Sequence, residues 1–151
     1  MKNFLRNNKG ITMISLVVTI FILAFVVGTV VYYSRSIAET ARFENVKANM
    51  ILIQAQAKII SEKYNYDSGS IEILGQPDES GFYILSSEDL EKMGMDDLVK
   101  EMQKSNDNAN YLVRYAIGDY RNQEIDVKYN KGIIYENTVY YLLSDIQAEG
   151  L

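Results

Sequence analysis

The chain has 151 residues and a formal net charge of −5, from 20 acidic and 15 basic residues. An excess of acidic residues argues against a general nucleic-acid-binding surface. The absence of Cys excludes disulfides, and the absence of His removes the commonest general base and zinc ligand.

The first ten residues form a short basic segment. Lys2, Arg6 and Lys9 are its charged residues, and none is acidic. Without Met1–Gly10, 12 basic and 20 acidic residues remain, a net charge of −8. Basic residues beside an apolar helix stay on the cytoplasmic side of a membrane. We therefore expect residues 1–10 to be a leader peptide, and we expect the N-terminus to be cytoplasmic.

An uncharged segment comes directly after this leader. The 24 residues Ile11–Ser34 include no Asp, Glu, Lys or Arg. About 20 apolar residues in a helix cross the hydrocarbon core of a bilayer. The sequence thus predicts a transmembrane helix over residues 11–34, with everything after Arg35 outside the cell membrane.

The helical pattern continues beyond the membrane. From Thr12 to about Lys63 there is no proline, and Gly28 is the one weak point, which predicts a single helix of ~78 Å. Its outer half, residues 35–63, carries two apolar rows at helical spacing. One row packing on the sheet and the other on neighbouring subunits would explain them, and so would one broad buried face in a monomer. The first row is Ile37, Ala41, Ala48, Leu52, Ala55 and Ile59, and the second is Phe43, Val46, Met50, Ile53, Ala57 and Ile60.

Residues 64–151 predict an α+β globular head. A turn at Asp67–Ser70 precedes two short strands, and two short helices come after them, the second starting at a capping Asp96 or Asp97. The expected strands are Ile71–Leu74 and Gly81–Leu85. The first expected helix runs from a cap at Ser87 to Gly94, and the second runs from its cap to Lys104.

The last third alternates between apolar and polar residues, which is typical of strands. Asn130–Gly132 has the composition of a hairpin turn, and Glu136-Asn137 predicts a second turn. We therefore expect an antiparallel meander of three or four strands. These cover Tyr111–Ile117, Ile125–Tyr129, Ile133–Tyr135 and Thr138–Leu143.

The junction between leader and apolar segment carries a more specific signal. Lys9-Gly10 followed by Ile-Thr-Met-Ile-Ser-Leu-Val-Val-Thr-Ile resembles the prepilin signal of type IV pilins and type II secretion pseudopilins. The resemblance implies cleavage between Gly10 and Ile11 by a prepilin peptidase, with methylation of the new N-terminus. It also implies a pilin-like fold, in which the long N-terminal helix packs on a small antiparallel sheet. Tyr83–Met95 and Val139–Ile146 are similar to patterns in Gram-positive pilin-like proteins.

Ser15 departs from the family pattern, in which a glutamate stands five residues after the cleavage site. In the family that glutamate pairs with the N-terminal amine of a neighbouring subunit. A hydroxyl cannot supply the charge that such a buried pair requires. Ser15 therefore favours a minor subunit, such as a filament tip, over a major pilin.

Three further groups of residues have a possible chemical role and a simpler explanation. Calcium could bind oxygens of the segment Asn106–Asn110, but this segment has one carboxylate and suits a plain turn. Five carboxylates could act as acid/base pairs, but they lie where helix starts favour negative charge. Interleaved Tyr and basic residues could hold single-stranded DNA, but strands favour aromatic residues for packing alone. The carboxylates are Glu88, Asp89, Glu91, Asp96 and Asp97, and the third group comprises Tyr111, Tyr115, Tyr120, Tyr129, Arg114, Arg121 and Lys128.

We therefore expect a structural subunit of a type IV pilus-like or type II secretion-like filament, with no enzymatic activity, cofactor, metal or nucleic-acid partner. Its implied partners are other pilin or pseudopilin subunits, the prepilin peptidase, the assembly platform and motor, and the membrane. Two alternatives stay open. One is a single-pass anchored extracellular binding module that does not polymerise. The other is a secreted enzyme, released by cleavage of a secretory signal near Ser34–Ser36.

Overall fold

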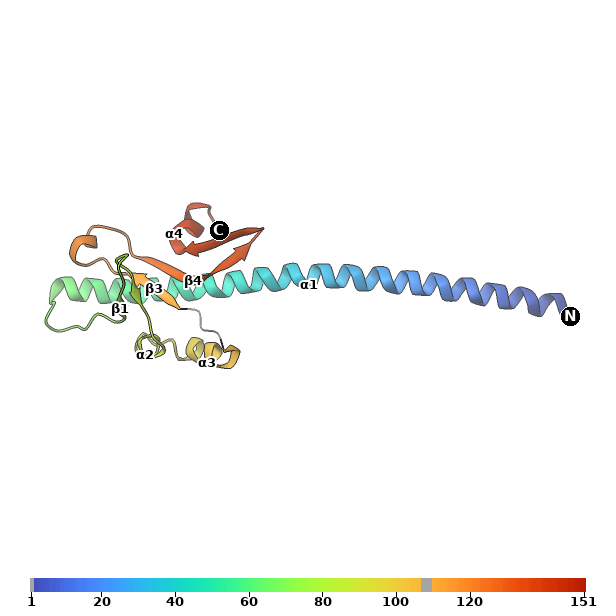
Figure 1. Cartoon of the computed structure of the whole chain (residues 1–151), viewed down its shortest axis with the longest axis horizontal. Coiled ribbons are helices and arrows are strands. Elements are labelled where there is room, and N and C mark those ends of the chain that lie inside the picture. Colours follow the sequence, from blue (N-terminus) through green and yellow to red (C-terminus); the bar gives the residue numbers. More distant parts are fainter. Residues whose placement is uncertain (1, 107–109) are drawn as a thin grey trace. The chain divides into compact units, whose positions relative to one another are not determined.

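The computed structural model describes residues 2–106 and 110–151, with side chains from Thr12 onward. It divides into two compact units, one ending at Thr40 and the other comprising Ala41–Leu151. Helix α1 supplies the whole described part of the first unit and the first 26 residues of the second (Figure 1). The elements are α1 (Lys2–Tyr66), β1 (Gln76–Pro77), β2 (Tyr83–Ile84), α2 (Ser87–Lys92), α3 (Asp96–Ser105), β3 (Tyr111–Arg114), the 3₁₀ helix η1 (Gly118–Tyr120), β4 (Asp126–Tyr135), β5 (Thr138–Leu142) and α4 (Leu143–Ala148).

The predicted long helix is confirmed and is longer than expected. Helix α1 runs for 65 residues without interruption, from Lys2 rather than Thr12 and to Tyr66 rather than Lys63. Residues 2–10, which we expect to be a leader peptide, therefore continue the same helix. No proline or glycine occurs there before Gly10, so nothing in the backbone stops the helix from extending to Lys2.

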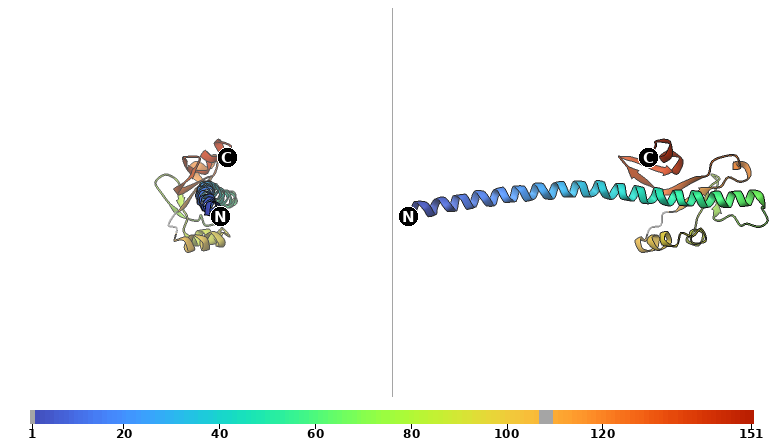
Figure 2. Two further views of the ribbon diagram at one scale, coloured as in Figure 1. Left: turned by 90° about the vertical axis from the view of Figure 1, so that its right-hand side faces the viewer. Right: turned by 180° about the vertical axis from the view of Figure 1, so that it is seen from behind.

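The second unit is an α+β arrangement around an antiparallel sheet. The sheet has five strands in the order β1-β2-β3-β4-β5, and each strand pairs with its neighbour in sequence. The expected antiparallel meander of the last third is thus confirmed with three strands, β3 to β5, and β1 and β2 extend the same sheet. Within this unit α2 and α3 lie on one side of α1, and α4 and β5 lie on the other (Figures 1 and 2).

The core of this unit lies between one face of α1 and the sheet. The Phe43 ring packs on Tyr135 and Tyr140, with centroid separations of 4.4 and 6.2 Å. The buried residues of this core include Phe43, Met50, Ile53, Ala57, Leu90, Val99, Val113, Tyr115, Val127, Leu143 and Ile146. Burial of apolar side chains in such a core is the main source of stability for a domain of about 110 residues.

The segment after α1 corrects one predicted strand. The turn at Asp67–Ser70 is confirmed, because the Ser70 N–H donates to the Asp67 carbonyl at 3.3 Å. Ile71–Leu74 is not a strand, since the first strand is Gln76–Pro77. Ile73 and Leu74 instead pack against the core, and the Leu74 carbonyl accepts a hydrogen bond from the Tyr115 hydroxyl at 3.0 Å.

The Asp78 side chain fixes the connection between β1 and β2. Its Oδ1 accepts hydrogen bonds from the Ser80 N–H and hydroxyl, at 2.8 and 2.6 Å, and from the Phe82 N–H at 3.0 Å. These donors, Ser80 above all, hold the pKa of Asp78 below its usual value. These hydrogen bonds therefore favour the ionised carboxylate.

Both short helices are present, with different caps from those predicted. Ser86 rather than Ser87 is the N-cap of α2, in a capping box with Asp89. Neither Asp96 nor Asp97 caps α3, because they are its first two residues and come after Met95, which makes no side-chain cap. Buried Met95 holds its position by packing in the core instead.

The predicted hairpin turn at Asn130–Gly132 is wrong. Strand β4 continues through it as one ten-residue strand, and the pairing with β5 shifts between Lys128 and Ile133, so the segment is a bulge. Glu136 and Asn137 have φ of 47° and 64° and form the hairpin turn, as expected. Helix α4 is an element that the sequence pattern does not predict, because the alternation typical of a strand extends through its first residue, Leu143.

Candidate assembly surface

The predicted cleavage site lies within α1. Gly10 and Ile11 have helical backbone, and their side chains lie outside the described residues. Ser15 is exposed on the same helix, and its carbonyl accepts a hydrogen bond from the Thr19 hydroxyl at 2.8 Å. The helix thus presents an exposed, uncharged side chain at position 15.

The apolar segment of α1 makes a continuous apolar surface. An 18-residue window of the helix Thr12–Tyr66 has a mean hydropathy of 2.8, and none of that window is buried. Phe21 and Phe25 are 73% and 74% exposed. Soluble monomers rarely expose apolar patches beyond a few hundred Å², so this helix is long and apolar enough to cross a membrane.

The two apolar rows of α1 have different environments within the second unit. Phe43, Val46, Met50, Ile53 and Ala57 are buried against the sheet, and Ile60 packs beside them. The members of the other row from Ala41 onward are all exposed. They are Ala41, Ala48, Leu52, Ala55 and Ile59. A single broad buried face is therefore wrong, and the row that includes Leu52 is exposed in the part of the chain that the structure describes.

A groove of about 700 Å³ borders the exposed row. Ile51 and Ala55 of α1 line one side, and the segment Arg121–Ile125 lines the other. The Gln54 amide, which also lines this groove, donates to the Ile125 carbonyl at 3.0 Å. The lining of this groove thus includes both apolar and polar side chains.

Two polar side chains of α1 bind the chain after β3, a feature that the sequence pattern did not reveal. Ser61 is 2% exposed, and its hydroxyl accepts a hydrogen bond from the Ala116 N–H at 3.1 Å. The Asn65 amide donates to the Ala116 carbonyl at 2.9 Å. Ser61 and Asn65 are four residues apart and so lie on one face of the helix, and this spacing could have indicated a shared polar contact. A single serine among apolar residues is too common to predict such a contact.

The carboxylate cluster is divided between two helix starts. Glu88 and Asp89 lie in the first turn of α2, and Asp96 and Asp97 lie in that of α3, as predicted. The prediction is wrong for Glu91, which lies beyond the first turn of α2. Glu88 also accepts a hydrogen bond from Lys92, at 3.2 Å, which raises the pKa of that lysine. Positions at helix starts and local ion pairs therefore account for Glu88, Asp89, Asp96 and Asp97.

The interleaved Tyr and basic residues do not form a stacking platform. Tyr111, Tyr115 and Tyr129 are buried in the core, so their faces are not available to bases. The Arg114 guanidinium lies over the Phe82 and Tyr120 rings, 5.4 and 5.6 Å from their centroids. Packing of the sheet is the role that the structure assigns to these aromatic residues.

The calcium hypothesis concerns Asn106–Asn110, and residues 107–109 of this segment lie outside the described residues. Asn106 has a left-handed backbone, with φ of 50°, and caps the end of α3. Among residues 12–106 and 110–151, whose side chains the structure describes, there is no cluster of three or more potential metal ligands.

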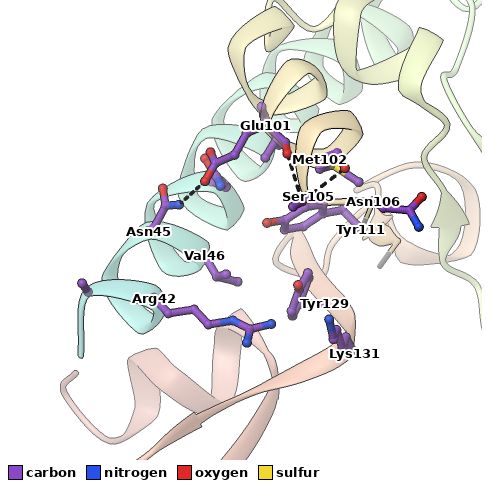
Figure 3. A pocket seen from close by; sticks show the side chains of 13 residues that line it. Arg42, Asn45, Val46, Glu101, Met102, Ser105, Asn106, Tyr111, Tyr129 and Lys131 are labelled. Carbon is purple, nitrogen blue, oxygen red and sulfur yellow. Dashed lines mark hydrogen bonds between the residues drawn. The ribbon is translucent and has the colours of Figure 1, made fainter. Parts of the chain in front are cut away.

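An open pocket of about 560 Å³ lies between α1, α3 and the strands β3 and β4. Arg42 extends from α1 toward Tyr129, and the Asn45 amide donates to the Glu101 carboxylate at 3.2 Å (Figure 3). Leu98, Val46 and Met102 contribute apolar side chains to the wall. The pocket is thus amphipathic, with both signs of charge at its rim.

These features define a class, namely an α+β chain with one N-terminal helix that is apolar and long enough to span a membrane. Comparison with protein-family models, with curated proteins and with solved structures gave no significant match.

Proposed function

We propose that this chain is a minor structural subunit of a type IV pilus-like or type II secretion-like filament. A prepilin peptidase would cleave it after Gly10, and it would then assemble through its N-terminal helix. The observation that carries the proposal is the uncharged, exposed segment of α1 that follows Lys9-Gly10, together with the exposed apolar row farther along the same helix. A monomeric membrane anchor needs about 20 apolar residues and has no use for that second row.

The exposed row supplies a reason for assembly outside the bilayer. Leu52 and Ile59 are 54% and 45% exposed, and Ala48 and Ala55 lie on the same side of the helix. Small residues beside large ones allow close approach of a neighbouring helix, and burial of the large ones is favourable in water. Transfer of the membrane segment itself gains little, since lipid is as apolar as protein, so an assembly motor is required.

Ser15 is the feature that favours a minor subunit. Without a carboxylate this subunit can offer its own N-terminal amine to a neighbour but cannot receive one. It therefore fits a position that receives no amine from another subunit, which is the tip or the initiating complex.

The proposal is tested by a charge placed on the exposed row. Leu52→Glu should leave the folded unit intact, because the side chain is exposed, but it should reduce the share of the protein in sheared filaments at least tenfold. The reason is that burial of an unpaired charge between subunits costs several kcal/mol. Ile84→Glu is the matched control, because Ile84 is an exposed apolar residue of β2, 37% exposed.

Quantitative mass spectrometry of the sheared and cell-bound fractions gives the measurement. Entry of Leu52→Glu into filaments at the level of the unaltered chain would show that the exposed row is not an assembly surface.

The pocket lined by Arg42 and Glu101 favours the second candidate function, an anchored extracellular binding module that does not polymerise. Processing separates the two functions. A binding module retains Met1 in cells that make the peptidase, and a filament subunit loses residues 1–10.

A further inference from the structure

Strand β5 is a free edge of the sheet. Its residues Thr138–Leu142 pair with β4 on one side. Among the residues that the structure describes, no backbone group hydrogen-bonds to the other side of this strand. A row of unpaired N–H and C=O groups is a template for another strand.

The two edges of the sheet differ in the features that prevent such pairing. The opposite edge, β1, has two residues, and one of them is Pro77, which has no N–H to donate. Strand β5 has five residues, Thr-Val-Tyr-Tyr-Leu, with no charge and no proline. Short strands, charges and prolines are the usual protection of an edge. Only the β1 edge is protected in this way.

An exposed apolar patch adjoins the free edge. Val139 and Tyr141 are 47% and 46% exposed on the outer face of β5, and Ile134 of β4, the partner of Val139, is 54% exposed. Gly132 has φ of +73°, and a Cβ there would lie 2.8 Å from side-chain atoms of both Val139 and Tyr141. The glycine thus lets both side chains lie close against β4, so the patch reaches the edge without a break.

We propose that β5 pairs antiparallel with β5 of a second copy of this chain, about a two-fold axis centred on Tyr140. In this register Val139 of each copy lies opposite Tyr141 of the other, so two aromatic–β-branched pairs form on the outer face. Thr138 lies opposite Leu142. Since the strand is uncharged, no like charges face each other, and the same surface serves both copies.

The net charge of the second unit gives this pairing a distinctive salt dependence. Residues 41–151 include 11 basic and 19 acidic residues, a net charge of −8. Two such units repel each other at long range, and salt screens this repulsion. Pairing of two copies therefore strengthens as salt is added, whereas docking of an oppositely charged protein weakens.

Disulfide trapping tests the proposal, because the chain has no Cys and each introduced thiol is the only one in its chain. The full-length chain carrying Gly10→Leu is used in detergent, so that the result is independent of cleavage and filament assembly. Chains with Val139→Cys are mixed with chains with Tyr141→Cys and oxidised mildly. Directly opposed strand positions lie within bridging distance, so a mixed dimer is expected at least fivefold above either chain alone.

Ile84→Cys chains give the matched control, since that residue is exposed and apolar but lies on an interior strand. The mixed dimer should increase between about 0.05 and 0.5 M salt, a range over which the screening length falls severalfold. Equal yields from the mixture and the control, or a yield that falls with salt, would overturn the proposal.

A second measurement needs no thiol. Sedimentation of the same full-length chain should show a dimer that Tyr141→Lys abolishes and Ile84→Lys preserves. Absence of the dimer in the unaltered chain, or its persistence in Tyr141→Lys, would contradict pairing through β5.

Discussion

The Ser61 hydroxyl, near the end of α1, accepts a hydrogen bond from the Ala116 N–H at 3.1 Å. Asn65, one helical turn later, donates to the carbonyl of the same residue at 2.9 Å. Strand β3 ends at Arg114, so α1 takes over as the hydrogen-bonding partner of the chain just beyond the sheet. Backbone groups that leave a sheet in a partly buried place need such partners.

Ser61→Ala should lower the free energy of unfolding by about 1–2 kcal/mol, because the Ala116 N–H loses its acceptor. Chemical denaturation of the full chain in detergent measures this. Glu62→Ala, at an exposed neighbour on the same helix, should change the stability by less than about 0.5 kcal/mol. Equal effects of the two substitutions would contradict the role of the hydrogen bond.

Asp126 is a buried carboxylate of β4 that caps α4 from another element. Its Oδ1 accepts from the Ser144 N–H at 3.1 Å, and its Oδ2 accepts from the Ser144 hydroxyl at 2.7 Å. Asp126→Ala should cost about 2–3 kcal/mol, since it leaves an N–H at the start of the helix without a partner. Asp145→Ala, at an exposed residue of α4, is the control. A loss no larger than that of the control would show that α4 does not depend on this cap.

We expect the folded protein to lose stability at high pH because of the buried Tyr115 hydroxyl. Burial raises the pKa of Tyr115 above its ordinary value of 10.0, and the nearby Asp89 contributes. The unfolded chain therefore loses this proton first as pH rises, and ionisation favours the unfolded state above about pH 10. The hydrogen bond from Tyr140 to Glu149 raises the pKa of Tyr140 in the same direction.

Melting temperature between about pH 8 and 11, a range that brackets the ordinary tyrosine pKa, measures the effect. Tyr115→Phe should flatten the decline, and Tyr66→Phe, at a residue that is 94% exposed, should not. An unchanged slope in Tyr115→Phe would contradict the assignment.

Ser15 predicts the abundance of the chain in filaments. We expect it to be scarce in sheared filaments relative to a subunit with glutamate at that position, because it cannot receive a neighbour's amine. Ser15→Glu should increase its entry along the shaft, and Ser15→Ala should not change it. Quantitative mass spectrometry that finds this chain as the dominant subunit would contradict the minor role.

Helical periodicity predicted both apolar rows of α1, but it could not say which of them the sheet covers. Phe43 and Leu52 each belong to a row of apolar residues at helical spacing, but Phe43 is buried and Leu52 is exposed. That difference depends on which face the distant strands approach. The local sequence pattern therefore could not predict which row is buried.

Predictions from the local sequence were wrong where contacts with distant residues determine the structure. Asn130–Gly132 has hairpin composition, yet pairing of Ile133 and Ile134 with β5 keeps β4 continuous through it. Helix α4 has no side-chain cap of its own at Leu142, and its cap, Asp126, is 16 residues earlier. No start signal was thus present where the helix begins.

The central claim is that this chain is a processed filament subunit, and the mass of its mature N-terminus tests the claim most directly. Intact-protein and peptide mass spectrometry of the membrane fraction should find a chain that begins at Ile11 and carries one added methyl group. Gly10→Leu should leave the leader attached, because a bulky residue replaces the glycine at the cleavage site. A mature chain that retains Met1, or normal processing of Gly10→Leu, would contradict the account.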